Sequence, residues 1–378
     1  MNYWYAHPAG HAIEGLKLCL GYHVGSSDTA IALLLNGRAP AAELGVCCPF
    51  ISEVYAVPFT SFAEAEGDPA AALVEVPREW SFVMDNHRAH DPDQMRFDGL
   101  RTFFEASWGH FRALDRHGIA GTAPPAYVPN QRLTLRLPDE LRQAAREELG
   151  DGHSIAILPA GSGAPWFYPS RTSWAMILGA LAEARPGTRF CILGKHTPDG
   201  RTVTRFTNAQ FDALAAAFPD AVDGIDRPLL AQLALVEASE LFISPHTGFA
   251  FAAQAVGIPW LAISGGHWHE YLFNHGVPVY SVLPDTQRYP CFAHGREPLP
   301  LIESDDDGEG PRTASMSAER IRHDLPQIVS AAELLLDGEL HYEDALADYF
   351  PRLLAVFGGD RSRIFTFDGV HEAYLAPA

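Results

Sequence analysis

The sequence predicts an α/β fold with two Rossmann-like domains, whose parallel sheets face each other across a cleft. Three observations support this prediction. The chain has 378 residues, about the length of two ordinary domains. In both halves, short apolar runs typical of buried parallel strands alternate with longer segments of helical periodicity. Residues 120–130, rich in Pro, Gly and Ala, are predicted to link the two halves.

The first half is predicted to contain short apolar strands separated by helices. Strands are expected at residues 2–6, 30–35, 54–58 and 81–85. Helices are expected at residues 11–22, where the apolar pattern is that of a largely buried helix, and at residues 97–117.

The second half alternates more regularly, which predicts a parallel sheet with right-handed crossovers. Pro138 is expected to start a helix, since proline is tolerated there. Strands are expected at residues 154–158, 189–193, 241–244, 260–264 and 277–283. Helices are expected at residues 173–184, 208–218, 228–238, 248–256, 317–336 and 341–356.

These patterns divide the chain into three parts. A first domain is expected at residues 1–125 and a second at residues 131–335. Residues 336–378 are expected to form a helical tail that packs back on the first domain.

The charge of the chain restricts its partners. The formal net charge is −20 at pH 7, from 47 acidic and 27 basic residues. Such a charge argues against nucleic acid or an anionic membrane as the main partner. A phosphate site in this chain has to be built from helix N-termini and a few local cations. No run of about 18 apolar residues occurs, so no stable membrane insertion is expected.

The five cysteines predict a reducing compartment. Their number is odd, two of them are adjacent, and no CxxC spacing occurs. This pattern fits neither a disulfide framework nor a zinc site. The N-terminus also lacks the basic and apolar regions of a signal peptide. We therefore expect a cytoplasmic protein.

Ligands of open parallel sheets bind where strands end and helices begin, so these turns are the expected sites. The strongest candidate is ISPHTG at residues 243–248. His246, Thr247 and Gly248 open a helix of small residues whose free backbone N–H groups can hold a diphosphate. An ordinary capped helix fits the pattern equally well, because Thr is a common N-cap residue.

Two more turns of the second half are candidates. In PAGSG, the residues Gly161, Ser162 and Gly163 suit a tight loop whose backbone donors face a phosphate or sugar, although a flexible turn has the same pattern. Lys195 in LGKH lies just past a predicted strand and can reach a phosphate as a point charge. A solvated surface lysine is the alternative.

The first half carries a candidate general base. His11 lies at the start of the first predicted helix, in HPAGH. Its ordinary pKa is near 6.5, and the positive helix end favours the neutral form that a base requires. Asp85 ends another predicted strand and can orient His11 or act as the base itself. Alternatively, His11 only starts the helix and Asp85 only caps a turn.

The HWHE segment at residues 267–270 raises the question of a metal site. The spacing is poor for one helix face and the sequence shows no third ligand. A loop that contacts substrate is favoured, and no metal or other cofactor is expected.

Taken together, these turns resemble glycosyltransferase family nine, the lipopolysaccharide heptosyltransferase-like family of the GT-B superfamily. The likeness is carried by ILPAGSG, by ELFISPHTGFAFAAQAVGIPWLAISG and by DTQRYPCF, in that order. Two positions depart from the family pattern, since His246 and His11 stand where family members usually have Asp. Arg171 is the best match to the usual basic residue after the first loop of the second domain.

The resemblance implies a GT-B fold and an inverting, metal-independent transfer of a sugar from a nucleotide-sugar to a small hydroxylated acceptor. The donor is ADP-, GDP-, UDP- or dTDP-linked, and the second domain binds it. The implied roles are catalytic for His11 and Asp85; donor-binding for Gly161, Ser162, Gly163, Arg171, Lys195, His246, Thr247 and Gly248; and acceptor-binding for His7, His87, His267 and His269. Two alternatives are a sugar-nucleotide epimerase of the same fold and a non-catalytic sugar- or nucleotide-binding protein.

Overall fold

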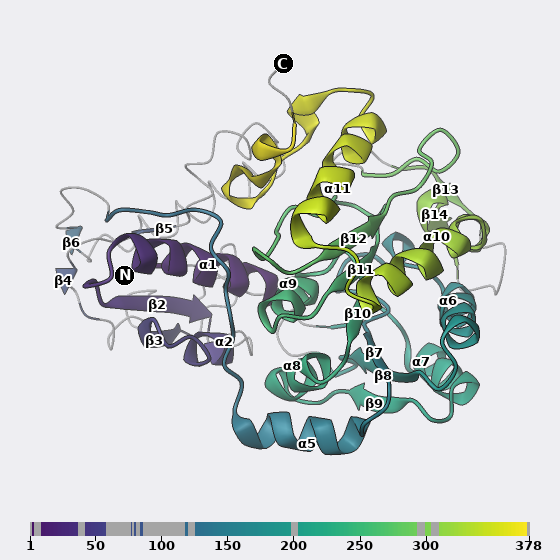
Figure 1. Cartoon of the computed structure of the whole chain (residues 1–378), viewed down its shortest axis with the longest axis horizontal. Coiled ribbons are helices and arrows are strands. Elements are labelled where there is room, and N and C mark those ends of the chain that lie inside the picture. The colour runs from purple at the N-terminus through teal and green to yellow at the C-terminus, as the bar shows by residue number, and fades with distance from the viewer. Residues whose placement is uncertain are drawn as a thin grey trace, which may run out of the picture. The chain divides into compact units, whose positions relative to one another are not determined.

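The computed structural model describes residues 2–3, 9–36, 42–57, 77, 79–80, 84–85, 118–119, 125–197, 203–292, 299–303 and 310–375. Its backbone divides into two compact units (Figure 1). The first unit is Met1–Arg136, and the second comprises Leu137–Pro198 and Val203–Ala378. The predicted helical tail is part of the second unit in this division.

The first unit is built on a parallel four-stranded sheet of order β3-β2-β1-β5. Its strands are β1 (Asn2–Tyr3), β2 (Ile31–Asn36), β3 (Ile51–Val57) and β5 (Met84–Asp85). The strands expected at 30–35 and 54–58 are thereby confirmed, with shifts at their ends. A further parallel pair joins β4 (Glu79–Trp80) to β6 (Gly118–Ile119).

The helix α1 (Ala9–Gly25) of the first unit packs on β2 and buries most of its length. This fits its sequence, in which apolar residues occur on nearly every side rather than in one stripe. A short helix, α2 (Ala42–Val46), precedes β3. The helix expected at 97–117 lies outside the described residues.

The second unit is built on a parallel six-stranded sheet of order β12-β11-β10-β7-β8-β9. The strands are β7 (Ser154–Ile157), β8 (Arg189–Gly194), β9 (Val222–Ile225), β10 (Leu241–Pro245), β11 (Trp260–Ile263) and β12 (Val279–Val282). The chain builds outward from β7 to β9 and then returns to build outward from β10 to β12. The winding direction therefore reverses between β7 and β10, which are neighbours in the sheet.

Seven helices of the second unit accompany this sheet among the described residues: α5 (Asp139–Leu149), α6 (Arg171–Ala184), α7 (Asn208–Ala217), α8 (Leu229–Glu237), α9 (Gly248–Ala255), α10 (Ala318–Leu336) and α11 (Tyr342–Val356). On one face, α6, α7 and α10 share a core with alternate strand residues such as Ile155, Ile157 and Ile243. Figure 1 shows α6 beside α10, and α5 beside α8.

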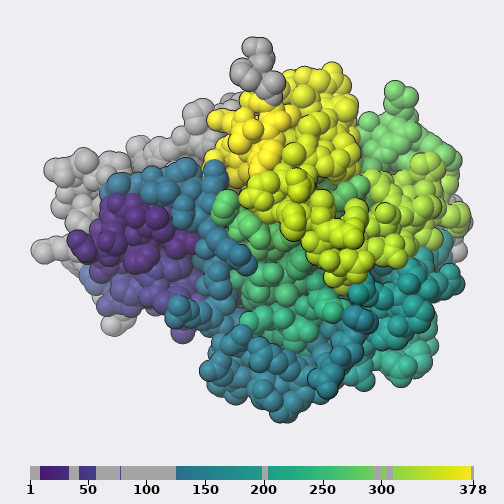
Figure 2. All heavy atoms as spheres, viewed as in Figure 1, coloured from purple at the N-terminus to yellow at the C-terminus, as the bar shows by residue number. Residues whose placement is uncertain are grey.

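The C-terminal part of the second unit packs on β12, which is an edge strand of its sheet. The helix α11 packs on β12, and Figure 2 shows the yellow C-terminal residues lying against the green ones of the same unit. A small antiparallel pair, β13 (Leu301–Ile302) with β14 (Arg312–Thr313), had no counterpart in the sequence prediction, and neither had β9. None of the helices described here is both long and apolar enough to cross a membrane.

Candidate functional site

The point where the second sheet reverses its winding is where open α/β sheets bind ligands. Two predicted loops meet there, one following β7 and the other following β10. A Cβ atom added at Gly161 would lie 3.1 Å from Cγ2 of Thr247 and 2.9 Å from the hydroxyl of Tyr168. Any larger residue would require Tyr168 or Thr247 to shift, so glycine favours this close approach of the two loops. The structure thus brings PAGSG and ISPHTG together, although they are far apart in the sequence.

The helix α9 begins at this meeting point. Thr247 is its N-cap, and the Thr247 hydroxyl accepts a hydrogen bond from the backbone N–H of Ala250 at 3.2 Å. Within the described part of the chain, the backbone N–H groups of Gly248 and Phe249 have no hydrogen-bond partner. Thr247 is therefore an ordinary cap, and two helix-start N–H groups remain for an anion.

The loop after β7 is held by Tyr168. The backbone N–H of Gly163 donates to the Tyr168 hydroxyl at 2.9 Å, so this N–H is already occupied. Burial raises the pKa of Tyr168 to about 12, which keeps the phenol protonated. Ser162 and Gly163 are exposed.

Lys195 follows β8, the strand next to β7. Its backbone N–H donates to the hydroxyl of Thr204 at 2.9 Å, and its carbonyl accepts from the Thr204 N–H at 2.7 Å. The next N–H, that of Arg205, donates to the carbonyl of Gly161 at 2.9 Å. The loops after β7 and β8 are therefore tied to each other, with Lys195 on one of them.

Arg205 is a cation that the sequence analysis missed. Its side chain is exposed and lies near enough to Tyr168 to lower the pKa of that phenol slightly against the dominant effect of burial. No local pattern marks it, because only the hydrogen bond to Gly161 brings this residue to the site. Arg171, the predicted cation, is the first residue of α6 after the cap Ser170, and its Nη2 lies 3.4 Å from the Thr172 hydroxyl.

His246 lies directly before the cap of α9. Its side chain is 14% exposed, and its ring packs against the rings of Phe251 and Tyr271. Burial lowers the pKa of His246 to about 3, and the nearby His267 adds to this effect. The imidazole is therefore neutral at pH 7, so the residue offers hydrogen bonds rather than charge to a ligand.

Glu270 faces His246 from the loop after β11, and its carboxyl group is fully buried. Oε2 accepts hydrogen bonds from the hydroxyls of Ser264 at 2.8 Å and Tyr349 at 3.1 Å. Oε1 lies 4.0 Å from Nδ1 of His246. Burial raises the pKa of Glu270, against the lowering effect of these hydrogen bonds. The sequence pointed to Glu270 only as part of the HWHE segment, either as a metal ligand or within a loop that contacts substrate.

The other histidines of the HWHE loop lie in different surroundings. His267 is partly buried beside the ring of Phe167, and burial lowers its pKa. His269 is fully buried, with Nε2 2.9 Å from the carbonyl oxygen of Phe365 and its ring against that of Phe365. His269 thus lies in the packing between this loop and the C-terminal segment. The described residues contain no group of three or more side chains arranged to hold a metal ion.

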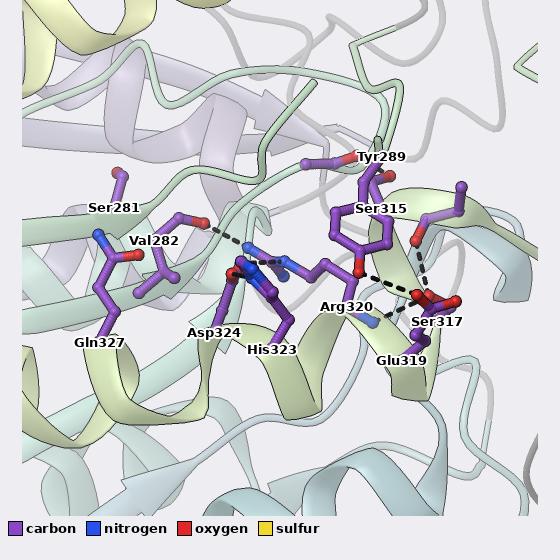
Figure 3. Close-up of polar contacts among 12 residues, drawn as sticks. Ser281, Val282, Tyr289, Ser315, Ser317, Glu319, Arg320, His323, Asp324 and Gln327 are labelled. Atoms are coloured by element: carbon purple, nitrogen blue, oxygen red, sulfur yellow. Dashed lines mark hydrogen bonds and ion pairs between the residues drawn. The ribbon is translucent and has the colours of Figure 1, made fainter. Parts of the chain in front are cut away.

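A buried ion pair between Arg320 and Asp324 lies beside the carboxyl end of the edge strand β12 (Figure 3). Arg320 of α10 is fully buried, and its Nε donates to Oδ2 of Asp324 at 2.7 Å. Its Nη2 donates to the carbonyl of Val282, the last residue of β12, at 2.6 Å. The pair ties α10 to the carboxyl end of β12, where the loops that carry the site begin. His323 adds a contact of 2.8 Å to the other oxygen of Asp324.

The predicted base belongs to the first unit. His11 is the third residue of α1 and is partly buried. Asp85 ends β5, which pairs with β1 so that Asp85 lies opposite Tyr3. His7 and His87 lie outside the described residues. The roles assigned to these four residues stay predictions.

No protein-family model matches the sequence, and no curated protein matches it. Solved structures do match. The glycosyl transferase family 9 protein from Veillonella parvula aligns over 89% of this chain and 96% of its own, with 13% identity and a TM-score of 0.51. The E. coli heptosyltransferase WaaC with ADP-2-deoxy-2-fluoro heptose covers 86% of this chain and 99% of its own, with 12% identity and a TM-score of 0.50. The chain therefore has the GT-B fold of this family, as the resemblance in its sequence implied.

Proposed function

We propose that this chain is an inverting glycosyltransferase that moves a sugar from a nucleotide-sugar onto a hydroxyl of a small polar or natural-product acceptor. The observation that carries the proposal is the contact of Gly161 with Thr247 at the switch point, directly before α9. Unpaired N–H groups at this helix start suit a diphosphate. The fold shared with glycosyltransferase family 9 favours a nucleotide-sugar as its source.

In this proposal, the leaving diphosphate accepts hydrogen bonds from the N–H groups of Gly248 and Phe249, and Ser162 lies on the facing loop. Lys195 and Arg205 supply positive charge from the neighbouring loop, and Arg171 does so from the start of α6. These groups stabilise the charge that develops on the leaving group, so the transfer requires no metal. The donor is an ADP-, GDP-, UDP- or dTDP-sugar.

The acceptor is activated by a residue of the first unit. His11, or alternatively Asp85, removes the proton of the acceptor hydroxyl, and the oxygen attacks the anomeric carbon opposite the nucleotide. The bond to the diphosphate breaks and the configuration inverts. His11→Ala should lower turnover by about two to four orders of magnitude if His11 is the base. Near-normal turnover of this variant, with loss of turnover in Asp85→Asn, would assign the base to Asp85.

The donor site is tested by thermal unfolding with ADP, GDP, UDP and dTDP. A diphosphate present at about a hundred times its dissociation constant adds about 2.7 kcal/mol of stability. Gly248→Asp places a carboxylate at the start of α9, where it suits the helix but repels the diphosphate. We expect this variant to melt like the wild type without ligand and to lose the shift with ligand.

The control is Asn208→Asp, which adds the same charge at the first position of α7. It should keep the shift. A shift that survives in Gly248→Asp would disprove the site. Incubation of each nucleotide-sugar without acceptor tests the alternative activity, because an epimerase would interconvert donor sugars whereas a transferase would leave them unchanged.

A further inference from the structure

Two polar atoms face each other beneath the start of α9, and neither makes a hydrogen bond. Nδ1 of His246 and Oε1 of Glu270 are both buried and both lack a hydrogen-bond partner in the described part of the chain. They lie 4.0 Å apart. A buried polar atom without a partner is costly, so a native structure rarely retains one. A movement of about 1 Å would satisfy both atoms with one hydrogen bond.

The surroundings of Glu270 determine which atom carries the proton of that hydrogen bond. Oε2 already accepts two hydrogen bonds, from Ser264 and Tyr349. Oε1 accepts none, so a proton on the carboxyl group belongs on Oε1. The Ser281 hydroxyl also lies near Glu270 and lowers the pKa of its carboxyl group as a hydrogen-bond donor does, although the distance and angle do not make it a hydrogen bond within the described residues.

The charged neighbours leave the carboxyl group free to be neutral. Arg320 is near enough to interact electrostatically with Glu270, but Asp324 at 2.7 Å already balances its charge. Cys291 is partly buried, and burial raises the pKa of its thiol, so the thiol is neutral. On the other side, His246 is neighboured by His267 and two aromatic rings, none of which supplies a negative charge.

We propose that Glu270 is a positioning residue that fixes the tautomer of His246. Its neutral carboxyl group donates from Oε1 to Nδ1 of His246, so the imidazole proton resides on Nε2. His246 then presents an N–H donor, without charge, at the diphosphate end of α9. Only the identity of the ligand rests on the proposed function, because the tautomer is a property of the protein without ligand.

The tautomer is tested by ¹⁵N NMR of the full chain labelled at histidine. The chain has 17 histidines, so the His246 signal is assigned by its loss in His246→Gln. We expect the wild type to show a protonated Nε2 and an unprotonated Nδ1. Glu270→Gln should keep this pattern, because its amide N–H₂ donates to Nδ1 while its oxygen accepts from Ser264 and Tyr349. Glu270→Met, which fills similar space but cannot donate, should give a mixture of tautomers.

The control is Ser264→Ala, which removes a hydrogen bond to Oε2 but leaves Oε1 unchanged. It should keep the wild-type pattern. An imidazolium or an Nδ1–H tautomer in the wild type would overturn the proposal, whether or not Glu270→Met folds. A wild-type pattern in Glu270→Met would also overturn it. So would an equal change in Ser264→Ala, because the change would then come from general loosening of the loop.

Calorimetry with ADP measures the consequence for binding. Glu270→Gln should bind ADP within about twofold of the wild type and Glu270→Met about tenfold more weakly. In a His246→Ala background, Glu270→Met should have no further effect, because the residue acts through His246. A further loss there would overturn the positioning role. Failure of ADP to bind the wild type would instead count against the proposed function, while the NMR result would still decide the tautomer.

Discussion

At the scale of single residues, Gly161 shows how one missing side chain shapes the site. The residue has no positive φ, so backbone conformation does not explain it. The surrounding space does, because a Cβ atom would lie 2.9 Å from the Tyr168 hydroxyl and 3.1 Å from a methyl group of Thr247. Gly161 was predicted from the sequence as part of a tight loop with backbone donors, and the structure adds the close approach of Thr247 as a reason for glycine here.

Gly161→Ala should therefore separate the two loops. We expect a loss of stability of about 1–3 kcal/mol, as for other overpacked sites, together with weaker nucleotide binding. Gly152→Ala is the matched control, since an added Cβ atom there meets nothing within 4 Å. Urea denaturation and calorimetry measure the two effects. Equal behaviour of the two variants would show that the loops tolerate the extra atom.

His246 should give the protein a particular pH dependence. Its folded pKa of about 3 lies below the ordinary value of 6.5. Between these values the unfolded chain binds a proton at His246 and the folded chain does not, so stability falls as the pH is lowered. Below pH 6.5, we expect the wild type to lose up to about 1.4 kcal/mol per pH unit more than His246→Gln. Parallel pH profiles of the two proteins in urea denaturation would contradict the buried neutral imidazole.

At the scale of elements, the strands and helices of the second unit were largely predictable. Apolar runs located β7, β8, β10 and β11, and their observed ends differ from prediction by one residue or none. Capping residues explain the helix starts, since Ser170, Thr207 and Ser317 each accept a hydrogen bond from the first turn. The strand β9 was missed because its four residues, VDGI, include a charge and a glycine that weaken strand propensity.

Two helices carry Arg–Asp pairs of opposite burial and so allow a controlled comparison. In α10, Arg320 and Asp324 are almost fully buried, whereas in α11 the Asp348 side chain that pairs with Arg352 is 48% exposed. Asp324→Asn leaves a buried charge without its partner, and we expect a cost of about 3–5 kcal/mol. Asp348→Asn should cost less than about 1 kcal/mol. Urea denaturation measures the stability lost in each variant. A similarly small loss in both would mean that Arg320 finds another partner.

At the scale of the whole molecule, the net charge of −20 opposes the approach of an anionic nucleotide. Salt screens this long-range repulsion, with a Debye length of about 10 Å at 0.1 M. The association rate of ADP should therefore rise by roughly two- to tenfold between low and physiological salt, opposite to electrostatically steered pairs. Stopped-flow measurements test this, with uncharged adenosine as the control. A rate that falls with salt would show that the local cations already dominate the approach.

The sequence by itself determined local features of this protein: the type and order of most elements of the second unit and the N-cap of α9. Each of these depends on residues that are close together along the chain. Only the tertiary structure decided that Gly161 lies against Thr247 and that Arg205 contacts the loop after β7. It also decided that Glu270 faces His246 while it accepts a hydrogen bond from Tyr349. The physical reason is that such contacts follow from the order of strands in the sheet and from burial, which join distant parts of the chain and leave no local pattern.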